Sequence, residues 1–414
     1  MHAVDAASGG SIEAAANDLA VALEVEEDGA WPLPASRSFA KAKLVTKSET
    51  LEGFGSAASP TLARTRAVME CVERFAQFAN AAPVTTISAT GESVEPEAVS
   101  PWLCGLYSRA QYATWEFPCE PYSPRDVIEW VQVRDLVRAG TRLLPVEFIY
   151  PRAPLRRKPL VVETSNGTAA HVDETAASLG AICEVIERDS LMLFWYRQPR
   201  TAAIAIADVP DRHLREELNA IVDMGFVVLL CDLAYDLGIP CFLVWALQQN
   251  TVAYGAGCAI DPIESLEHAV RELGTSLRFV CREGPASTAL FPLNNVRSPE
   301  HHRGLYHRGP LHDVLRQLLG RIVRPERRDH MKWEREQPSL PRLVETLARR
   351  GYIPYSYDLT PALPAVTGIR VVRVIVPGLV PLHFGHDRTR FGCKRLSGKE
   401  GPGRFSTTLP HFMS

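Results

Sequence analysis

The amino-acid sequence predicts a mixed α/β (α+β) protein, with helices and strands combined in one integrated domain over residues 31–414. One observation behind this prediction is a turn–helix unit that recurs three times along the chain at fixed internal spacing. Another is that strand-like segments alternate with segments of helical period, which is typical of mixed architectures. No clear linker separates the three units, which favours a single domain.

Residues 1–30 are expected to form a flexible or weakly structured segment, because they are rich in Ala, Gly and Ser and then become acidic. A short helix over Ile12–Leu23 is the alternative. The domain begins at Trp31-Pro32-Leu33-Pro34. Outside the three units, we expect one further helix, over His213–Met224. The expected strands are Phe39–Val45, Val127–Asp135, Leu143–Tyr150, Ala202–Ala207, Phe226–Asp232 and Cys241–Gln248.

The central unit opens with the polar turn Ser165-Asn166-Gly167 and continues as a long helix that ends in the apolar run Leu191–Trp195. Glu184 and Glu187 are three residues apart, so they lie on one face of this helix. Two carboxylates beside a buried run are costly unless a cation pairs with them. A metal ion and Arg188 are both candidates, and a surface helix with solvated ion pairs is the remaining alternative.

The first unit repeats this design nearer the N-terminus and reads GFGSAASPTLARTRAVMECVERF. Gly53 and Gly55 are expected to form its turn, and Glu70 and Glu73 keep the spacing of the central pair. The helix is expected to run to about Asn80.

The third unit reads GAGCAIDPIESLEHAVRELGTSL. Gly255, Gly257 and Glu272 match Gly53, Gly55 and Glu70 of the first unit in spacing. Thr275 stands where a second Glu is expected, so only two of the three units keep an ExxE pair.

Four carboxylates brought together bare would repel one another, so we expect Mg²⁺ among Glu70, Glu73, Glu184 and Glu187. Mg²⁺ retains waters or phosphate oxygens as further ligands, and Gly-containing turns and helix N-termini attract phosphates. The implied site therefore binds a Mg²⁺-nucleotide. It is not a P-loop, because GxxxxGK[ST] occurs nowhere in the chain.

The motifs SNGTAA and CEVIERD resemble the YcaO family, whose ATP site is built from paired ExxE helices. The resemblance covers the chain from about Pro34 onwards, and it implies a single YcaO-type domain with ATP and Mg²⁺ as cofactors. In the third unit the family usually has a Gln where Thr275 stands, followed by arginines that reach phosphate. The nucleotide-binding residues implied are Ser165, Asn166, Gly167, Arg74, Arg188, Arg278 and Arg282.

The C-terminal stretch Val376–Gly385, VPGLVPLHFG, resembles the D component of thiazole/oxazole cyclodehydratases. Azoline-forming relatives commonly end in a proline-rich terminus that lies in the active site, whereas this chain ends in LPHFMS. The resemblance implies His411 and the C-terminal carboxylate of Ser414 as the catalytic base. It also predicts that Leu409–Ser414 are ordered and approach the glutamates.

The resemblance implies an ATP-dependent enzyme that activates backbone amides of a ribosomally made precursor peptide. The favoured outcome is cyclodehydration of Cys, Ser or Thr to an azoline, and the alternatives are a macroamidine or a thioamide. A nucleotide-binding scaffold subunit without turnover is a hypothesis from a different class, which the altered third unit permits. The expected partners are the precursor peptide and an E1-like or leader-peptide-binding protein, and a homodimer is an open alternative to a monomer.

Composition adds few constraints beyond these. The net charge of −3 over 414 residues gives no reason to expect nucleic acid or an anionic membrane as a partner. No apolar run approaches the roughly 20 residues that span a bilayer, and the first residues lack the pattern of a signal peptide. Nine Cys without a CxxC pair are typical of reduced thiols, so a cytoplasmic protein is expected.

Residues 297–313 contain four histidines: His301, His302, His307 and His312. Their spacing fits no closed zinc motif, no Cys lies nearby, and Pro310 interrupts any helix. A loop beside a substrate groove is favoured over a zinc site.

Overall fold

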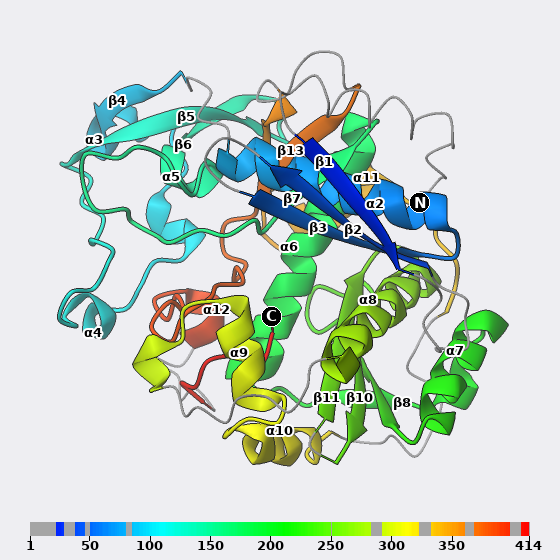
Figure 1. Ribbon diagram of the computed structural model, residues 1–414. Coiled ribbons are helices and arrows are strands. Elements are labelled where there is room, and N and C mark those ends of the chain that lie inside the picture. The colour runs from blue at the N-terminus through cyan, green and yellow to red at the C-terminus, as the bar shows by residue number, and fades with distance from the viewer. Residues whose placement is uncertain are drawn as a thin grey trace.

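The computed structural model describes residues 22–28, 38–45, 50–79, 85–249, 251–282, 292–322, 333–360, 368–397 and 407–413 (Figure 1). Its strands are β1 (Ala22–Asp28), β2 (Ser38–Val45), β3 (Thr50–Ala57), β4 (Ile87–Thr90), β5 (Val127–Asp135), β6 (Thr141–Pro145), β7 (Thr168–His171), β8 (Ala202–Ile204), β9 (Val227–Asp232), β10 (Cys241–Gln248), β11 (Thr251–Cys258), β12 (Tyr355–Asp358) and β13 (Arg370–Ile375). Its α-helices are α2 (Pro60–Arg74), α3 (Gly91–Val94), α4 (Arg109–Tyr112), α5 (Val146–Ile149), α6 (Glu174–Tyr196), α7 (Arg212–Asp223), α8 (Pro262–Arg282), α9 (Pro299–Tyr306), α10 (His312–Leu319), α11 (Leu340–Arg349) and α12 (Lys394–Ser397).

The mixed fold is confirmed, and its strands form three sheets. One has the order β1-β2-β3, the second β11-β10-β9-β8, and the third β4-β5-β12-β13-β7 with β6 beside β5. The named strands pair antiparallel throughout the described residues, which is the α+β form of the predicted class. Among the described helices, none has the length and apolar character needed to cross a membrane.

Several local predictions need correction. Residues 22–28 form strand β1, which pairs with β2, so this part of the first 30 residues is not weakly structured. The expected helix over Ile12–Leu23 lies almost wholly outside the described residues. The expected strand Leu143–Tyr150 divides into the end of β6 and the short helix α5. The expected strand Ala202–Ala207 ends at Ile204, before a turn of 3₁₀-helix.

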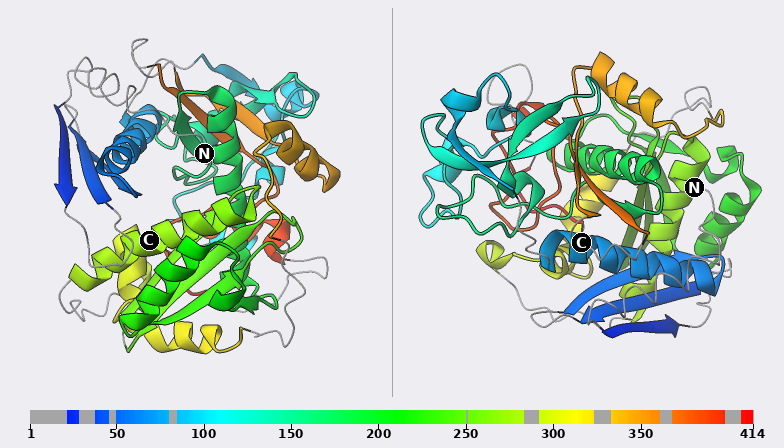
Figure 2. Two further views of the ribbon diagram at one scale, coloured as in Figure 1. Left: turned by 90° about the vertical axis from the view of Figure 1, so that its right-hand side faces the viewer. Right: turned by 90° about the horizontal axis from the view of Figure 1, so that it is seen from above.

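The three repeated units close into a ring around the centre of the molecule. Each unit is a strand followed by a long helix: β3 and α2, β7 and α6, and β11 and α8. Helix α2 also contacts β7, α6 contacts β11, and α8 contacts β3, so each helix packs on the strand of the next unit. The two views of Figure 2 show α2, α6 and α8 converging from different sides. This closure brings one face of each helix toward a common site.

The spacing predicted that the glycines of the first and third units form turns. This prediction is wrong, because these glycines lie inside strands β3 and β11. A Cβ atom at Gly55 would lie 1.9 Å from the carbonyl oxygen of Ala63, and one at Gly257 would lie 2.3 Å from that of Ser265. These residues are therefore glycine because a helix backbone crosses close above the strand. Only Gly167 of the central unit lies in a turn, with φ of 74°.

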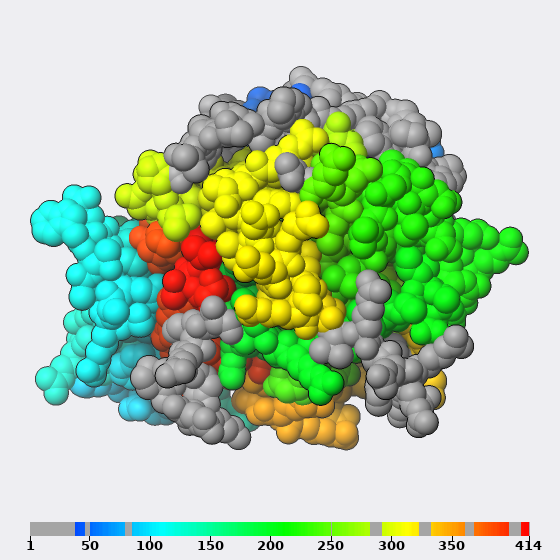
Figure 3. Space-filling model, turned by 90° about the horizontal axis from the view of Figure 1, so that it is seen from below, coloured from blue at the N-terminus to red at the C-terminus, as the bar shows by residue number. Residues whose placement is uncertain are grey.

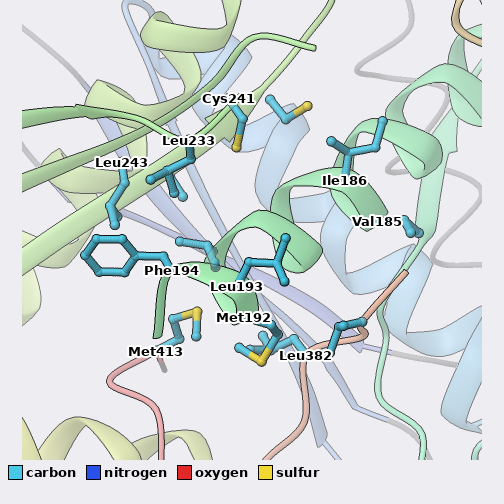
Figure 4. Close-up of a cluster of buried hydrophobic side chains, with 14 of the residues drawn as sticks. Val185, Ile186, Met192, Leu193, Phe194, Leu233, Cys241, Leu243, Leu382 and Met413 are labelled. Atoms are coloured by element: carbon cyan, nitrogen blue, oxygen red, sulfur yellow. The ribbon is translucent and has the colours of Figure 1, made fainter. Parts of the chain in front are cut away.

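Helix α6 runs through the largest hydrophobic core, which explains the apolar run at its C-terminal end. Strand β10 is buried on both faces: Leu243 and Trp245 contact the core around α6, while Phe242 and Val244 face α7 and α8. Figure 4 shows Leu243, Phe194 and Met413 in this core, so the C-terminal segment is part of the packed interior.

Candidate functional site

The four predicted glutamates come together, and the third unit adds Glu272; these five residues are called the carboxylate cluster below. The five carboxylates are close enough that the charge of one changes the pKa of another. The negative charge of Glu272 raises the pKa of both Glu70 and Glu187, and that of Glu184 raises the pKa of Glu73. One helix from each unit therefore supplies a carboxylate.

The two glutamates of α2 are anchored by backbone N–H groups of neighbouring strands. Phe54 N–H in β3 donates to Glu70 over 2.6 Å, and Ala170 N–H in β7 donates to Glu73 over 2.8 Å. Arg74 pairs with Glu70 at 2.5 Å and also donates to a carbonyl of β3. The contact with the carbonyl of Glu52 ties the helix to its own strand, whereas the pair with Glu70 lies within α2.

The central unit is tied together in the same way. Gly167 N–H donates to Glu184 over 3.2 Å, and Arg188 lies 3.6 Å from the same carboxylate. The pairing of Arg188 with Glu184 that the helical spacing predicted is confirmed. The Nε atom of Arg188 and the Oδ1 atom of Asn166 are buried and have no hydrogen-bond partner in the described part of the chain, whereas Ser165 is exposed.

Burial is the main cause of the raised pKa values in the cluster. It raises the pKa of Glu73 to about 8 and that of Glu187 to about 7, with further contributions from neighbouring carboxylates. The side chains of Glu70 and Glu184 are nevertheless 32% and 26% exposed, so a ligand can reach the cluster from solvent. A set of carboxylates that is costly to ionise without a cation fits Mg²⁺.

In the described part of the chain, no three side chains of His, Cys, Asp or Glu already converge tightly enough to hold a metal ion. Mg²⁺ usually binds through one or two carboxylates and completes its octahedron with waters and phosphate oxygens. The cluster therefore fits Mg²⁺ that arrives together with a nucleotide better than a permanently held ion.

Two arginines were predicted to reach phosphate from the third unit, and this role stays a prediction. Arg278 stacks over the ring of Phe39 at 4.8 Å, and the side chain of Arg282 lies outside the described residues. Arg271 was missed, although it directly precedes Glu272. Its positive charge lowers the pKa of Glu187, and its Nη1 atom is buried without a hydrogen-bond partner. Thr275 donates to the carbonyl of Arg271 within α8.

A second missed residue is Arg373 of β13, which is completely buried beneath the central turn. It donates to the carbonyl oxygens of Phe148 and Thr164 and pairs with Glu163 at 3.2 Å. Its charge also lowers the pKa of Glu184. The role of Arg373 comes from packing between segments about 200 residues apart, which no local pattern reveals.

The C-terminal residues Leu409–Met413 are described and pack into the core around α6, whereas Ser414 lies outside the described residues. Their approach to the glutamates stays a prediction. Phe412 packs within 4.9 Å of the ring of Tyr254. Burial lowers the pKa of His411 well below 6.5, and the nearby charge of Arg188 lowers it further. His411 is therefore a neutral imidazole. Figure 3 shows the C-terminal segment in red beside α9 and α10 in yellow.

The four histidines of residues 297–313 do not form a metal site among the described residues. Both ring nitrogens of His302 and of His312 contact backbone groups, and His307 accepts from Val252 N–H at 3.4 Å. His301 accepts from Arg297 N–H at 3.2 Å.

A scan of protein-family models matches residues 54–380 to the model described as "YcaO cyclodehydratase, ATP-ad Mg2+-binding". A protein described as "Uncharacterized protein in tfuA 3'region", from Rhizobium leguminosarum bv. trifolii, is 27% identical over 80% of this chain and 78% of its own length. The described fold resembles a solved heterocyclase in complex with substrate and cofactor, with a TM-score of 0.75 and 19% identity.

That match covers 97% of this chain and 57% of the heterocyclase, so the chain spans little more than half of that protein's length. The E. coli microcin synthetase McbBCD complex with pro-MccB17 bound contains a chain with a TM-score of 0.64 and 15% identity, and the match covers 94% of this chain and 96% of that one. The structural likenesses agree with the family match, which extends over most of the chain, and the protein belongs to the YcaO family.

Proposed function

We propose that this protein is an ATP-dependent enzyme that activates backbone amides of a ribosomally made precursor peptide, with cyclodehydration of Cys, Ser or Thr to an azoline as its reaction. The observation that carries the proposal is the carboxylate cluster, to which all three repeated units contribute. A purely structural helix interface gains nothing from carboxylates that are brought together and raise one another's pKa.

In this proposal, Glu70, Glu73, Glu184 and Glu187 hold Mg²⁺, and the partly buried cations Arg188 and Arg271 face the phosphates. When bound, ATP supplies the phosphoryl group and Mg²⁺ neutralises its charge. Arg74 and Arg373 keep the strands and helices of the site in place through their backbone contacts. Ser165, Asn166 and Gly167 form the turn nearest to Glu184, where the buried Asn166 Oδ1 atom lacks a partner.

The chemistry has three steps on the peptide. A side-chain thiol or hydroxyl attacks the preceding carbonyl carbon, and its proton passes to a base. The resulting oxyanion takes the γ-phosphoryl group of ATP, which leaves ADP. Loss of the amide N–H proton and of phosphate then forms the C=N bond of the azoline. His411 is the proposed base, since its imidazole is neutral, and the C-terminal carboxylate of Ser414 is the other candidate.

The proposed reaction also requires a peptide substrate and a protein that delivers it. A separate leader-binding or E1-like protein is proposed to deliver the peptide, which the multi-component McbBCD assembly with pro-MccB17 supports as a precedent of the same fold. If an amine or an external sulfide attacks the same activated carbonyl, the product is a macroamidine or a thioamide instead.

The test is mass spectrometry of a Cys/Ser/Thr-containing precursor peptide incubated with the protein, its partner and Mg²⁺-ATP. Cyclodehydration predicts loss of one water for each phosphate released, together with loss of a thiol or hydroxyl that can be alkylated or acylated. Loss of water with every thiol and hydroxyl still present indicates a macroamidine. Replacement of oxygen by sulfur indicates a thioamide, and Mg²⁺-ATP binding without turnover indicates a scaffold subunit.

A further inference from the structure

The C-terminal segment, residues 407–413, is held by side chains of two helices. Three successive backbone carbonyls each accept one side-chain hydrogen bond: Leu409 O from Trp195 Nε1 at 3.0 Å, Pro410 O from the hydroxyl of Tyr306, and His411 O from His302 Nδ1 at 2.7 Å. His302 and Tyr306 are four residues apart in α9, so they present one face of that helix to the segment.

The protonation of His302 follows from its two partners. Gly385 N–H can only donate, and it lies 2.9 Å from His302 Nε2, so this nitrogen accepts. The proton of the neutral ring is then on Nδ1, which donates to the carbonyl oxygen of His411. Burial lowers the pKa of His302 to about 4, so the ring is neutral at physiological pH.

The protonation of His411 follows in the same way. Its Nε2 contacts the carbonyl oxygen of His383, which can only accept, so Nε2 carries the proton. Its Nδ1 therefore keeps a free lone pair, and this buried atom has no hydrogen-bond partner among the described residues. A buried, unprotonated imidazole nitrogen with no partner is costly for folding, and its lone pair is available to accept a hydrogen bond from a ligand.

The charged and titratable groups that act on His411 are few. They are His302 from α9, His383 from the loop after β13, and Arg188 from α6. Arg188 also interacts electrostatically with Tyr254, which raises the pKa of Arg188. The ring of Tyr254 packs against Phe412. Arg188 therefore links His411 electrostatically to the carboxylate cluster, because the same guanidinium pairs with Glu184 at 3.6 Å.

We infer that His302 is a positioning residue: its Nδ1–H bond to the His411 carbonyl fixes the C-terminal segment so that His411 presents an unprotonated Nδ1 to the peptide. This inference rests on the proposed function in one respect: the molecule that gives its proton to His411 is taken to be the precursor peptide. It also gives a role to a histidine-rich stretch that forms no metal site among the described residues.

The test compares two substitutions of His302 that each keep one half of the imidazole. His302→Asn retains a side-chain N–H near the Nδ1 position and can still donate to the His411 carbonyl. His302→Gln places its polar atoms near the Nε2 position and keeps the contact with Gly385 instead. His301→Asn, on the same helix, is the matched control, because His301 Nδ1 accepts from the backbone N–H of Arg297 at 3.2 Å. Circular dichroism confirms that each variant is folded.

The first readout is NMR of histidine-labelled protein, which identifies the tautomer of His411 without any substrate. We expect the Nε2–H form in the wild type, in His302→Asn and in His301→Asn, and a mixture of tautomers in His302→Gln. The second readout is the rate of water loss from a synthetic Cys/Ser/Thr-containing peptide with Mg²⁺-ATP and the partner protein. It should fall by at least about 10-fold in His302→Gln and by less than about 3-fold in His302→Asn, with unchanged affinity for Mg²⁺-ATP.

A His411 ring protonated at Nδ1 in the wild type overturns the inference, as does an unchanged tautomer and rate in His302→Gln. An equal loss of the His411 tautomer in both His302 variants also overturns it, because the role would then be general packing. A wild-type protein that modifies no peptide contradicts the proposed function instead, and in that case the tautomer measurement alone decides the positioning role.

Discussion

Glu73 of α2 accepts a hydrogen bond from the backbone N–H of Ala170 in β7 over 2.8 Å, and this bond joins the first repeated unit to the second. The bond also holds a carboxylate whose pKa is raised by burial to about 8. A group raised above its unfolded pKa takes up protons on folding, so it lowers stability increasingly as the pH rises from about 4.5 toward 8.

Glu73→Gln should therefore stabilise the metal-free protein while weakening nucleotide binding. The amide oxygen can still accept from Ala170, and the unfavourable buried charge is removed, so we expect a gain on the order of 1 kcal/mol at neutral pH. Thermal unfolding in chelator and in Mg²⁺-ATP measures both effects. Glu345→Gln on the exposed face of α11 is the control, and loss of stability in Glu73→Gln with normal ligand stabilisation would contradict the assignment.

Arg188→Lys should lower ATP turnover by at least about 10-fold, because Lys lacks the planar fork that reaches the Glu184 carboxylate and a phosphate together. Phosphate release measures the effect. Arg212→Lys provides the control, since Arg212 makes the same i,i+4 pair with Glu216 on the exposed helix α7. A near wild-type rate for Arg188→Lys would remove Arg188 from the site.

Phe412→Ala should destabilise the protein by about 3 to 5 kcal/mol, the usual cost of deleting a buried aromatic ring. Phe412 is 2% exposed and packs against Phe194, Trp195 and Trp245. Urea denaturation measures the loss, and Trp115→Ala, at an 88% exposed residue, should change stability by less than about 0.5 kcal/mol. A small effect of Phe412→Ala would contradict this packing. Because Phe412 and Met413 are part of the core, deleting Pro410–Ser414 tests folding as well as catalysis.

Acidification should destabilise the fold through three buried histidines. Burial lowers the pKa of His302 and His307 to about 4 and that of His383 to about 3. A histidine whose folded pKa lies below the unfolded value of about 6.5 stabilises the fold above that pH and loses this contribution as the pH falls. Between pH 7 and pH 5, each should cost on the order of 1 to 2 kcal/mol, measured by denaturant unfolding. Glu73 acts in the opposite direction over this pH range, so the comparison is made in the Glu73→Gln variant. Equal stability of that variant at both pH values would contradict the burial of these rings in neutral form.

Gly55→Ala should prevent stable folding, because its Cβ would lie 1.9 Å from the carbonyl oxygen of Ala63 and α2 would have to move away from β3. Gly140→Ala meets no atom within 4 Å and should be tolerated. Soluble yield and thermal midpoint compare the two, and a normal midpoint for Gly55→Ala would show that the strand–helix contact is loose.

The carboxylate pairs could be predicted from sequence because helical spacing is local: Glu184 and Glu187 share a face whatever surrounds them. The glycines could not be assigned in the same way. Sequence does not distinguish a glycine required by positive φ, such as Gly167, from one required by a close helix, such as Gly55. Tertiary packing also decided the division of Leu143–Tyr150 between strand and helix.

Long-range partners are the other part that sequence could not supply. Arg373 reaches the central turn from β13, and His302 reaches the C-terminal segment from α9, over separations of more than 100 residues. The recurring units indicated that Glu272 matches Glu70 in its own helix, but only the closed ring shows that both belong to one cluster.

The most direct test of a Mg²⁺-nucleotide site in the carboxylate cluster is equilibrium binding of ATP, with and without Mg²⁺, to four proteins: the wild type, Glu187→Gln, Glu272→Gln and Glu345→Gln. We predict tight binding by the wild type and Glu345→Gln only when Mg²⁺ is present. Both cluster variants should bind at least about 10-fold more weakly while remaining folded. Equal Mg²⁺-dependent affinity in all four proteins would contradict this account and place the nucleotide elsewhere.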